Sequence, residues 1–122
     1  GIVVGYETGR QLQIQTIFAE RLNSKLTLRR GFEIPENSNV LIVEDVITTG
    51  KSAMECSEIV KSNKAKLVGY ACIIDRSNTK VLIKEKIISQ IKFEIKTFRK
   101  DELPNELKNL PALKPGSNNL LK

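Results

Sequence analysis

The residue types best suited to chemistry in this chain lie at positions 40–52, with the sequence Val-Leu-Ile-Val-Glu-Asp-Val-Ile-Thr-Thr-Gly-Lys-Ser. The apolar run over residues 40–43 predicts a strand covered on both faces, and Glu44 and Asp45 follow it directly. In open α/β sheets, ligands bind beyond the carboxyl ends of the strands. Two adjacent carboxylates at such an end can both accept hydrogen bonds from the vicinal hydroxyl groups of a ribose.

The loop after the two acids has the composition of a phosphate-binding loop. It leads into a predicted helix, whose first backbone N–H groups have no intrahelical partner and whose dipole favours an anion. Gly50 permits a positive φ or a close approach to a ligand. A Walker A loop is excluded because that motif requires glycine where Asp45 stands. The candidate phosphate-binding residues are Val46, Ile47, Thr48, Thr49, Gly50, Lys51 and Ser52. An acid pair or a Thr-Thr-Gly turn alone is common in proteins, but their combination with a strand and a helix indicates a sugar-phosphate site.

The elements that must position this segment alternate between helix and strand patterns. The expected helices cover residues 1–12 and 52–61, and the expected strands cover 40–43, 67–74 and 92–98. Extended pieces are predicted at 16–22 and 25–32, a turn at 35–39, and either helix or strand at 81–88. This alternation predicts an α/β fold with a mainly parallel sheet flanked by helices. We expect one domain over residues 1–122, with a tail at 103–122 that has three prolines and few apolar anchors.

Composition narrows the classes of function. The net charge is +6, but no run of Lys or Arg exceeds two residues and only six residues are aromatic, so a phosphorylated small ligand is a better prediction than nucleic acid. The longest apolar runs are far short of the roughly 20 residues that span a membrane. The absence of His excludes His-dependent nucleophilic and metal chemistry. Cys56 and Cys72 lack metal-ligand spacing and are expected to be buried free thiols in the cytoplasm.

Residues 40–52 resemble the phosphoribosyl-pyrophosphate signature of the type I phosphoribosyltransferases, and three further stretches are similar to the orotate phosphoribosyltransferases within that family. Residues 1–11 resemble the helix that follows the family's pyrophosphate loop. Residues 18–21, together with Leu-Arg-Arg-Gly-Phe at 28–32, resemble the strand pair of a compact bacterial subgroup. Ala-Leu-Lys-Pro-Gly-Ser at 112–117 resembles the C-terminal ending of that subgroup.

This resemblance implies transfer of ribose 5-phosphate from phosphoribosyl pyrophosphate to N1 of orotate, with Mg²⁺ bound through the diphosphate and the ribose hydroxyls rather than by protein side chains. By position, Glu44 and Asp45 would hold the ribose hydroxyls, residues 48–52 would surround the 5-phosphate, and Thr48 would also lie beside orotate. Arg76 would pair with the orotate carboxylate, a partner that suits guanidinium geometry. The candidate cations for pyrophosphate are Arg21, Lys25, Arg29 and Arg30, although solvated charges on a hairpin explain these four equally well.

The resemblance also implies a homodimer and an N-terminal hood and pyrophosphate loop that would precede Gly1. We therefore expect this chain alone to be weakly active or inactive. Two alternatives stay open: a purine or uracil phosphoribosyltransferase, for which Arg76 is not needed, and a non-catalytic RNA-binding regulator on the same fold, which the net charge permits. We favour the enzyme, with neither a nucleic acid nor a membrane as its partner.

Overall fold

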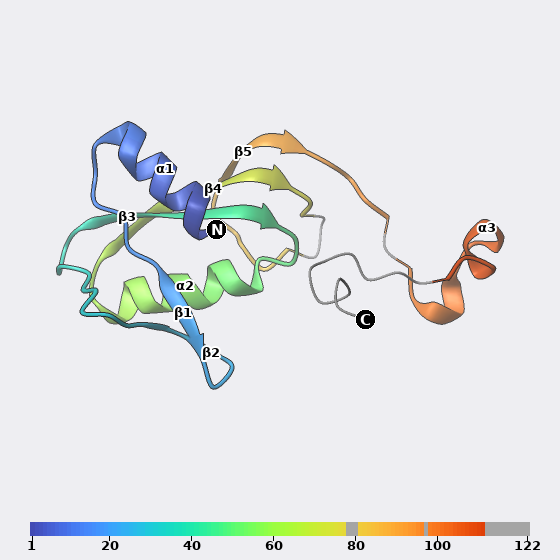
Figure 1. Ribbon diagram of the computed structural model, residues 1–122, viewed down its shortest axis with the longest axis horizontal. Coiled ribbons are helices and arrows are strands. Elements are labelled where there is room, and N and C mark those ends of the chain that lie inside the picture. The colour runs from blue at the N-terminus through green and yellow to red at the C-terminus, as the bar shows by residue number, and fades with distance from the viewer. Residues whose placement is uncertain (78–80, 97, 112–122) are drawn as a thin grey trace, which may run out of the picture.

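The computed structural model describes residues 1–77, 81–96 and 98–111 (Figure 1). Along the chain the elements are α1 (Ile2–Leu12), β1 (Ala19–Leu22), β2 (Lys25–Leu28), β3 (Asn39–Ile47), α2 (Lys51–Ser62), β4 (Lys66–Asp75), β5 (Ile87–Lys92), the 3₁₀ helix η1 (Lys100–Glu102) and α3 (Asn105–Lys108). Strands β3, β4 and β5 form a parallel sheet in that order, and β1 and β2 form a separate antiparallel hairpin. The predicted α/β class with a parallel sheet flanked by helices is confirmed.

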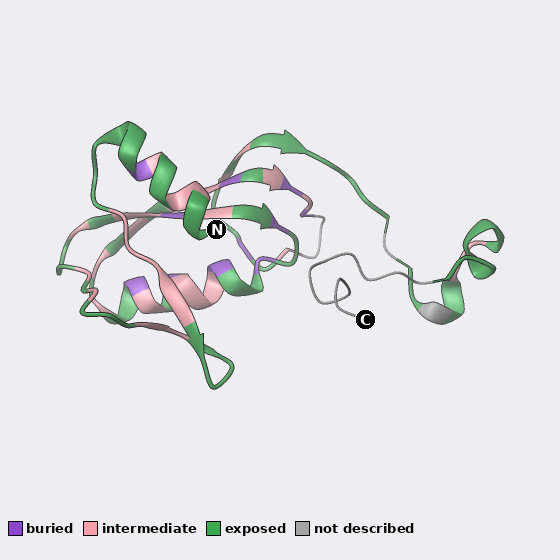
Figure 2. Ribbon diagram, viewed as in Figure 1, coloured by how far each residue is buried: buried purple, intermediate pink, exposed green. Residues whose placement is uncertain are grey.

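The core lies between the sheet and α2, whereas α1 lies on the opposite side of the sheet (Figures 1 and 2). Helix α2 returns the chain from β3 to β4, and its apolar side chains recur every three to four residues, which places them on the face toward the sheet. The buried apolar residues are Ile42, Ile47, Ala53, Val60, Tyr70, Cys72 and Ile83. Within the described residues, no helix is both long enough and apolar enough to span a membrane.

Strand β3 extends further than the sequence predicted. We expected it to end at Val43, but it continues through both acids to Ile47 because its register with β4 runs as far as the pair Ile47 and Asp75. Glu44 and Asp45 therefore lie within the last part of the strand and not after it. The sheet tolerates these charges because β3 is its edge strand, so water and ligands can reach one side.

The β1–β2 hairpin is held by a two-residue turn. Asn23 and Ser24 have φ of 48° and 67°, and two positive φ values in succession match the right-handed twist of a tight hairpin. Both strands are shorter than the extended pieces predicted at 16–22 and 25–32. The second strand ends where Arg30 and Gly31 turn the chain with φ of 59° and 74°.

The predicted final strand at 92–98 is wrong. The strand lies earlier, at Ile87–Lys92, within and just beyond the segment whose pattern was ambiguous. Its pairing partner β4 ends at Asp75, opposite Lys92, so the following apolar alternation finds no further strand to pair with in the described part of the chain. Residues 112–122, which include the Ala-Leu-Lys-Pro-Gly-Ser stretch, lie outside the described residues.

Candidate functional site

Glu44 and Asp45 meet at the open edge of β3, beside the start of α1. The Gly1 ammonium nitrogen lies 3.9 Å from Glu44 Oε2 and 3.4 Å from Asp45 Oδ1. Neighbouring side chains in a strand point to opposite faces of the sheet, yet at this edge both carboxylates lie within 4 Å of the same nitrogen. The Gly1 nitrogen is within hydrogen-bond distance of Asp45 only, but the two carboxylates lie close enough together to bind neighbouring groups of one ligand.

The two carboxyl groups differ in acidity. Burial raises the pKa of Glu44, and the nearby ammonium offsets this only in part. Burial acts in the same direction on Asp45, but the Val46 N–H, 3.0 Å from Oδ1, and the ammonium outweigh it, so the pKa of Asp45 is lowered. Asp45 is also the more exposed, with 61% of its side chain accessible against 22% for Glu44. Asp45 is therefore the stronger acid and the better placed to remain charged.

The loop after β3 ends in an uncapped helix start. Thr48 and Thr49 are exposed, and α2 begins at Lys51 after Gly50, with no side-chain cap and no acidic residue in its first turn among the described residues. The Lys51 N–H donates to Thr49 Oγ1 at a long 3.4 Å, and the exposed residues Thr48, Thr49, Lys51 and Ser52 present their polar groups at this helix start. Such a helix start favours an anion through its unpaired N–H groups and its dipole.

Gly50 is required by both its backbone conformation and its surroundings. Its φ of +78° lies in the left-handed region, and a Cβ atom there would stand 2.9 Å from Ile83 Cγ1 and 3.4 Å from Val81 Cγ2. The segment after β4 therefore packs directly on the loop after β3. The sequence reasoning missed this contact, for which the only local signal was the apolar pair Val81 and Ile83 in a charged stretch.

Two backbone hydrogen bonds fix the same two segments to each other. The Arg76 N–H donates to the Ile47 carbonyl at 2.8 Å, and the Leu82 N–H donates to the Thr49 carbonyl at 2.9 Å. Arg76 is half-buried, and its Nε is buried with no hydrogen-bond partner among the described residues. A buried donor without a partner costs about 1–3 kcal/mol, and more when it is charged. The Arg76 Nε–H is therefore suited to donate a hydrogen bond to an acceptor on a ligand.

The four basic candidates lie on or beside the hairpin, and three are engaged in ion pairs. Arg21 Nη1 donates to Glu55 Oε2 on α2 at 3.0 Å, and Arg29 and Arg30 both pair with Glu20. Lys25, at the start of β2, is exposed and forms no ion pair within the described ranges. Exposed ion pairs contribute only about 0–1 kcal/mol, so an anionic ligand could compete for these arginines.

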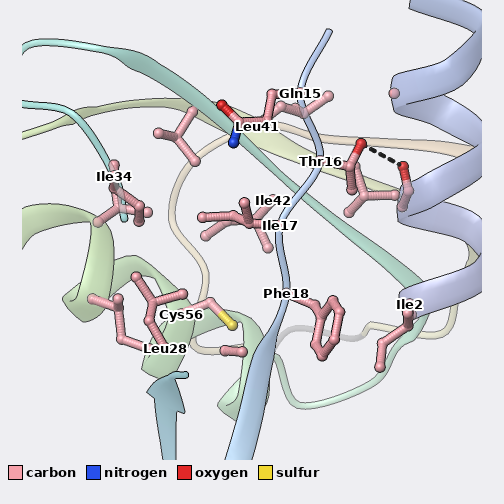
Figure 3. A pocket seen from close by; sticks show the side chains of 18 of the residues that line it. Ile2, Gln15, Thr16, Ile17, Phe18, Leu28, Ile34, Leu41, Ile42 and Cys56 are labelled. Carbon is pink, nitrogen blue, oxygen red and sulfur yellow. Dashed lines mark hydrogen bonds between the residues drawn. The ribbon is translucent and has the colours of Figure 1, made fainter. Parts of the chain in front are cut away.

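A cavity of about 880 Å³ opens along the edge of β3, between α1, the hairpin and α2 (Figure 3). Its walls are largely apolar and include Ile17, Phe18, Ile42 and Cys56. Of the four basic candidates, Arg21 alone lines it, and Glu44 and Ser52 are also among its lining residues. A largely apolar lining is poorly suited to phosphate, but Glu44 and Ser52 belong both to this lining and to the polar segment at residues 44–52, so the cavity adjoins that segment.

The structure thus brings the acid pair, residues 46–52 and Arg76 to the carboxyl ends of neighbouring strands. It places Lys25, Arg29 and Arg30 on the hairpin surface instead.

Comparison with known proteins gives an independent view of the same residues. The model of the phosphoribosyl transferase domain matches residues 2–102. An orotate phosphoribosyltransferase of Chlorobium phaeobacteroides (strain BS1) is 49% identical over 120 residues, covering 98% of this chain and 62% of that protein. One of Methylorubrum extorquens (strain PA1) is 46% identical over 123 residues, covering 100% and 63%. The chain therefore spans somewhat over three fifths of the length of these curated relatives.

Among solved structures, a crystal structure of an adenine phosphoribosyltransferase is similar with a TM-score of 0.55. The similarity covers 73% of this chain and 61% of that one at 23% sequence identity. At that identity the likeness supports the fold alone.

Proposed function

Since the chain belongs to the phosphoribosyl transferase family, whose domain model matches residues 2–102, we propose that the protein is an orotate phosphoribosyltransferase. The reaction would transfer ribose 5-phosphate from phosphoribosyl pyrophosphate to orotate, giving orotidine 5′-monophosphate and pyrophosphate for pyrimidine biosynthesis. The choice of base rests on Arg76. Its guanidinium Nε is buried without a partner in the described structure, and its backbone N–H is hydrogen-bonded to Ile47, next to the phosphate loop. A carboxylated base supplies the acceptor that this nitrogen lacks.

The ribose would bind at the acid pair. Glu44 and Asp45 lie together at the β3 edge, where each carboxylate could accept a hydrogen bond from one of the two vicinal hydroxyl groups. Mg²⁺ prefers oxygen ligands and is commonly bound through substrate phosphates. It would be held here by the diphosphate and the ribose hydroxyls rather than by protein side chains, and it would neutralise charge on the diphosphate.

The 5-phosphate would bind at the start of α2. The first-turn N–H groups, the hydroxyls of Thr48, Thr49 and Ser52, and the Lys51 ammonium form a donor set of the right charge. Thr48 lies one residue after Ile47, whose carbonyl binds Arg76, so we place Thr48 beside the base. This arrangement sets the reacting carbon between the phosphate loop and Arg76.

Catalysis would be mainly placement and electrostatics. As the bond from the ribose carbon to pyrophosphate lengthens, positive charge develops on the ring, and the carboxylates of Glu44 and Asp45 lie next to it. Orotate is anionic, so its N1 needs no histidine to activate it. Arg76 would hold its carboxylate and fix N1 on the opposite side from the leaving group.

The departing pyrophosphate needs positive charge. The first turn of α1 begins beside the acid pair, so its N–H groups and dipole contribute there. Of the hairpin cations, Lys25 is our first choice because it is exposed and not ion-paired in the described structure, and Arg21, Arg29 and Arg30 would have to leave their carboxylate partners.

We propose that the enzyme acts as a cytoplasmic homodimer without nucleic acid. Two free thiols, at half-buried Cys56 and buried Cys72, suit a reducing compartment. Large apolar side chains such as Val3, Tyr6 and Ile88 are exposed by 81%, 64% and 58%, which is favourable for association with a second copy.

The test compares turnover of orotate, uracil, adenine and hypoxanthine by the protein expressed from its full coding sequence. We expect turnover of orotate alone, and an Arg76→Gln variant should lose about 100-fold in kcat/KM because a charge-assisted contact is removed. The exposed Arg99 provides a matched control, and Arg99→Gln should be unchanged. Turnover of a purine or uracil without orotate would overturn the proposal.

A further inference from the structure

A buried carboxylate next to Arg76 has no part in the chemistry described so far. Asp75 is the last residue of β4, and its side chain is only 6% exposed. A buried charge is costly unless it is paired and hydrogen-bonded. The contacts of Asp75 therefore indicate what it does.

The first contact closes a turn around Arg76. Asp75 Oδ1 accepts a hydrogen bond from the Ser77 N–H at 2.7 Å, a side-chain to backbone bond that spans two residues. Ser77 is itself buried, with 8% of its surface exposed. The residue enclosed by this turn is Arg76, and its own N–H is bound to the Ile47 carbonyl. The backbone on both sides of Arg76 is thereby fixed.

The second contact balances the charge. Lys92 Nζ, at the end of β5, lies 3.5 Å from Asp75 Oδ2, and the Phe93 N–H donates to the Asp75 carbonyl at 2.8 Å. The hydrogen bonds from Ser77 and the charge of Lys92 outweigh burial and lower the pKa of Asp75, so it carries a negative charge beside the site. Without Lys92 that charge would repel an anionic base.

We propose that Asp75 is a positioning residue for Arg76, and that Lys92 neutralises it so that the site accepts a carboxylated base. This inference rests on the proposed function, because it assigns the Arg76 guanidinium to the base carboxylate. Asp75 acts through the Ser77 turn, which sets where the Arg76 backbone lies relative to the phosphate loop. Within the described residues the Asp75 side chain is bound to the Ser77 N–H and Lys92, and not to the acid pair or to side chains of residues 46–52, so the effect should fall mainly on the base.

Two substitutions at Asp75 separate the turn from the charge. Asp75→Ala removes the acceptor for the Ser77 N–H, and we expect KM for orotate to rise about tenfold or more while KM for phosphoribosyl pyrophosphate is unchanged. Asp75→Asn keeps an acceptor oxygen without the charge, so it should restore most of the orotate affinity. Asp101, an exposed acid in η1, provides the control, and Asp101→Ala should change neither KM.

A second pair of variants tests the role of Lys92. Lys92→Met leaves Asp75 charged and unpaired, so KM for orotate should rise several-fold, and the double variant Asp75→Asn/Lys92→Met should return toward the wild-type value. This comparison also serves if Asp75→Ala does not fold.

The outcomes separate the two proposals. If the wild-type protein does not turn over orotate, the proposed function fails and this inference with it. If the wild type is active, the inference alone is overturned when Asp75→Ala leaves KM for orotate unchanged, when it raises both KM values equally, or when Asp75→Asn is as impaired as Asp75→Ala.

Discussion

Gly50→Ala should be among the most destabilising single-methyl additions in the described part of this protein. Gly50 ends the phosphate loop with φ of +78°, and forcing an L-residue into this left-handed region costs about 1–2 kcal/mol. The new Cβ would also stand 2.9 Å from Ile83 Cγ1 and 3.0 Å from Ile83 Cδ1. Ile83 is only 5% exposed and belongs to the core, so moving it would disturb the residues packed around it. Overpacking of this kind costs about 1–3 kcal/mol, so the total is about 2–5 kcal/mol.

Gly31→Ala is the matched control. Gly31 has nearly the same backbone conformation, with φ of +74°, but a Cβ there has nothing within 4 Å. Gly31→Ala should therefore lose only the stability that the left-handed backbone conformation costs an L-residue, about 1–2 kcal/mol. The gain from a less flexible unfolded chain, about 0.4–1 kcal/mol, applies to both variants and cancels in the comparison.

The assay is equilibrium unfolding in urea for the wild type and both variants, with the slopes compared to confirm a common unfolded state. We expect Gly50→Ala to be less stable than Gly31→Ala by about 1–3 kcal/mol. Adding Ile83→Ala to Gly50→Ala should be less than additive, because the smaller side chain makes room for the methyl group. Equal destabilisation by the two glycine substitutions, or full additivity with Ile83→Ala, would refute the packing argument.

Three further predictions concern other contacts. At Gly9 a Cβ would clash with Thr16 Oγ1, so Gly9→Ala should cost about 3 kcal/mol of stability. At Gly5 a Cβ would meet only Thr16 Cγ2 at 3.8 Å, so Gly5→Ala should stabilise α1 by about 0.5–1 kcal/mol. Changes of the same sign in urea unfolding would contradict this. Burial and nearby carboxylates raise the pKa of Cys56 to about 11. In a Cys72→Ser background, alkylation of Cys56 by iodoacetamide at pH 8 should therefore be about 100-fold slower than that of a free thiol and should accelerate as the pH rises toward 11. Fast modification at pH 8 would contradict this, because it would show that the thiolate is accessible. The pKa of Asp75 in the folded protein is lowered from 3.8. The wild type should therefore be more stable than Asp75→Asn above pH 4, and this advantage should be lost as the pH falls through the folded pKa. An equal difference in unfolding free energy at pH 7 and pH 2 would contradict this prediction.

Local patterns were sufficient for some elements and insufficient for others. The predicted ends of α1, α2 and β4 lie within one residue of the observed ends. Helical spacing and a bounded apolar run are properties of the segment itself, so the sequence is sufficient to locate them. The ends of β3 and β5 were not predicted, since a strand continues only as far as its neighbour supplies backbone partners. The apolar alternation at 92–98 has the pattern of a strand but faces no such partner after Asp75.

The sequence by itself determined the chemistry available to this protein: two adjacent carboxylates, a hydroxyl-rich loop at a helix start, and an arginine after the next apolar strand. These are consequences of residue type and short spacing, which act within a few positions along the chain. Only the tertiary structure decided that both acids lie together at an open strand edge, that Ile83 packs on Gly50, that the Arg76 N–H binds the Ile47 carbonyl, and that Lys92 pairs with Asp75. These contacts depend on the register and the path of three parallel strands, which are set by packing between segments far apart in the chain.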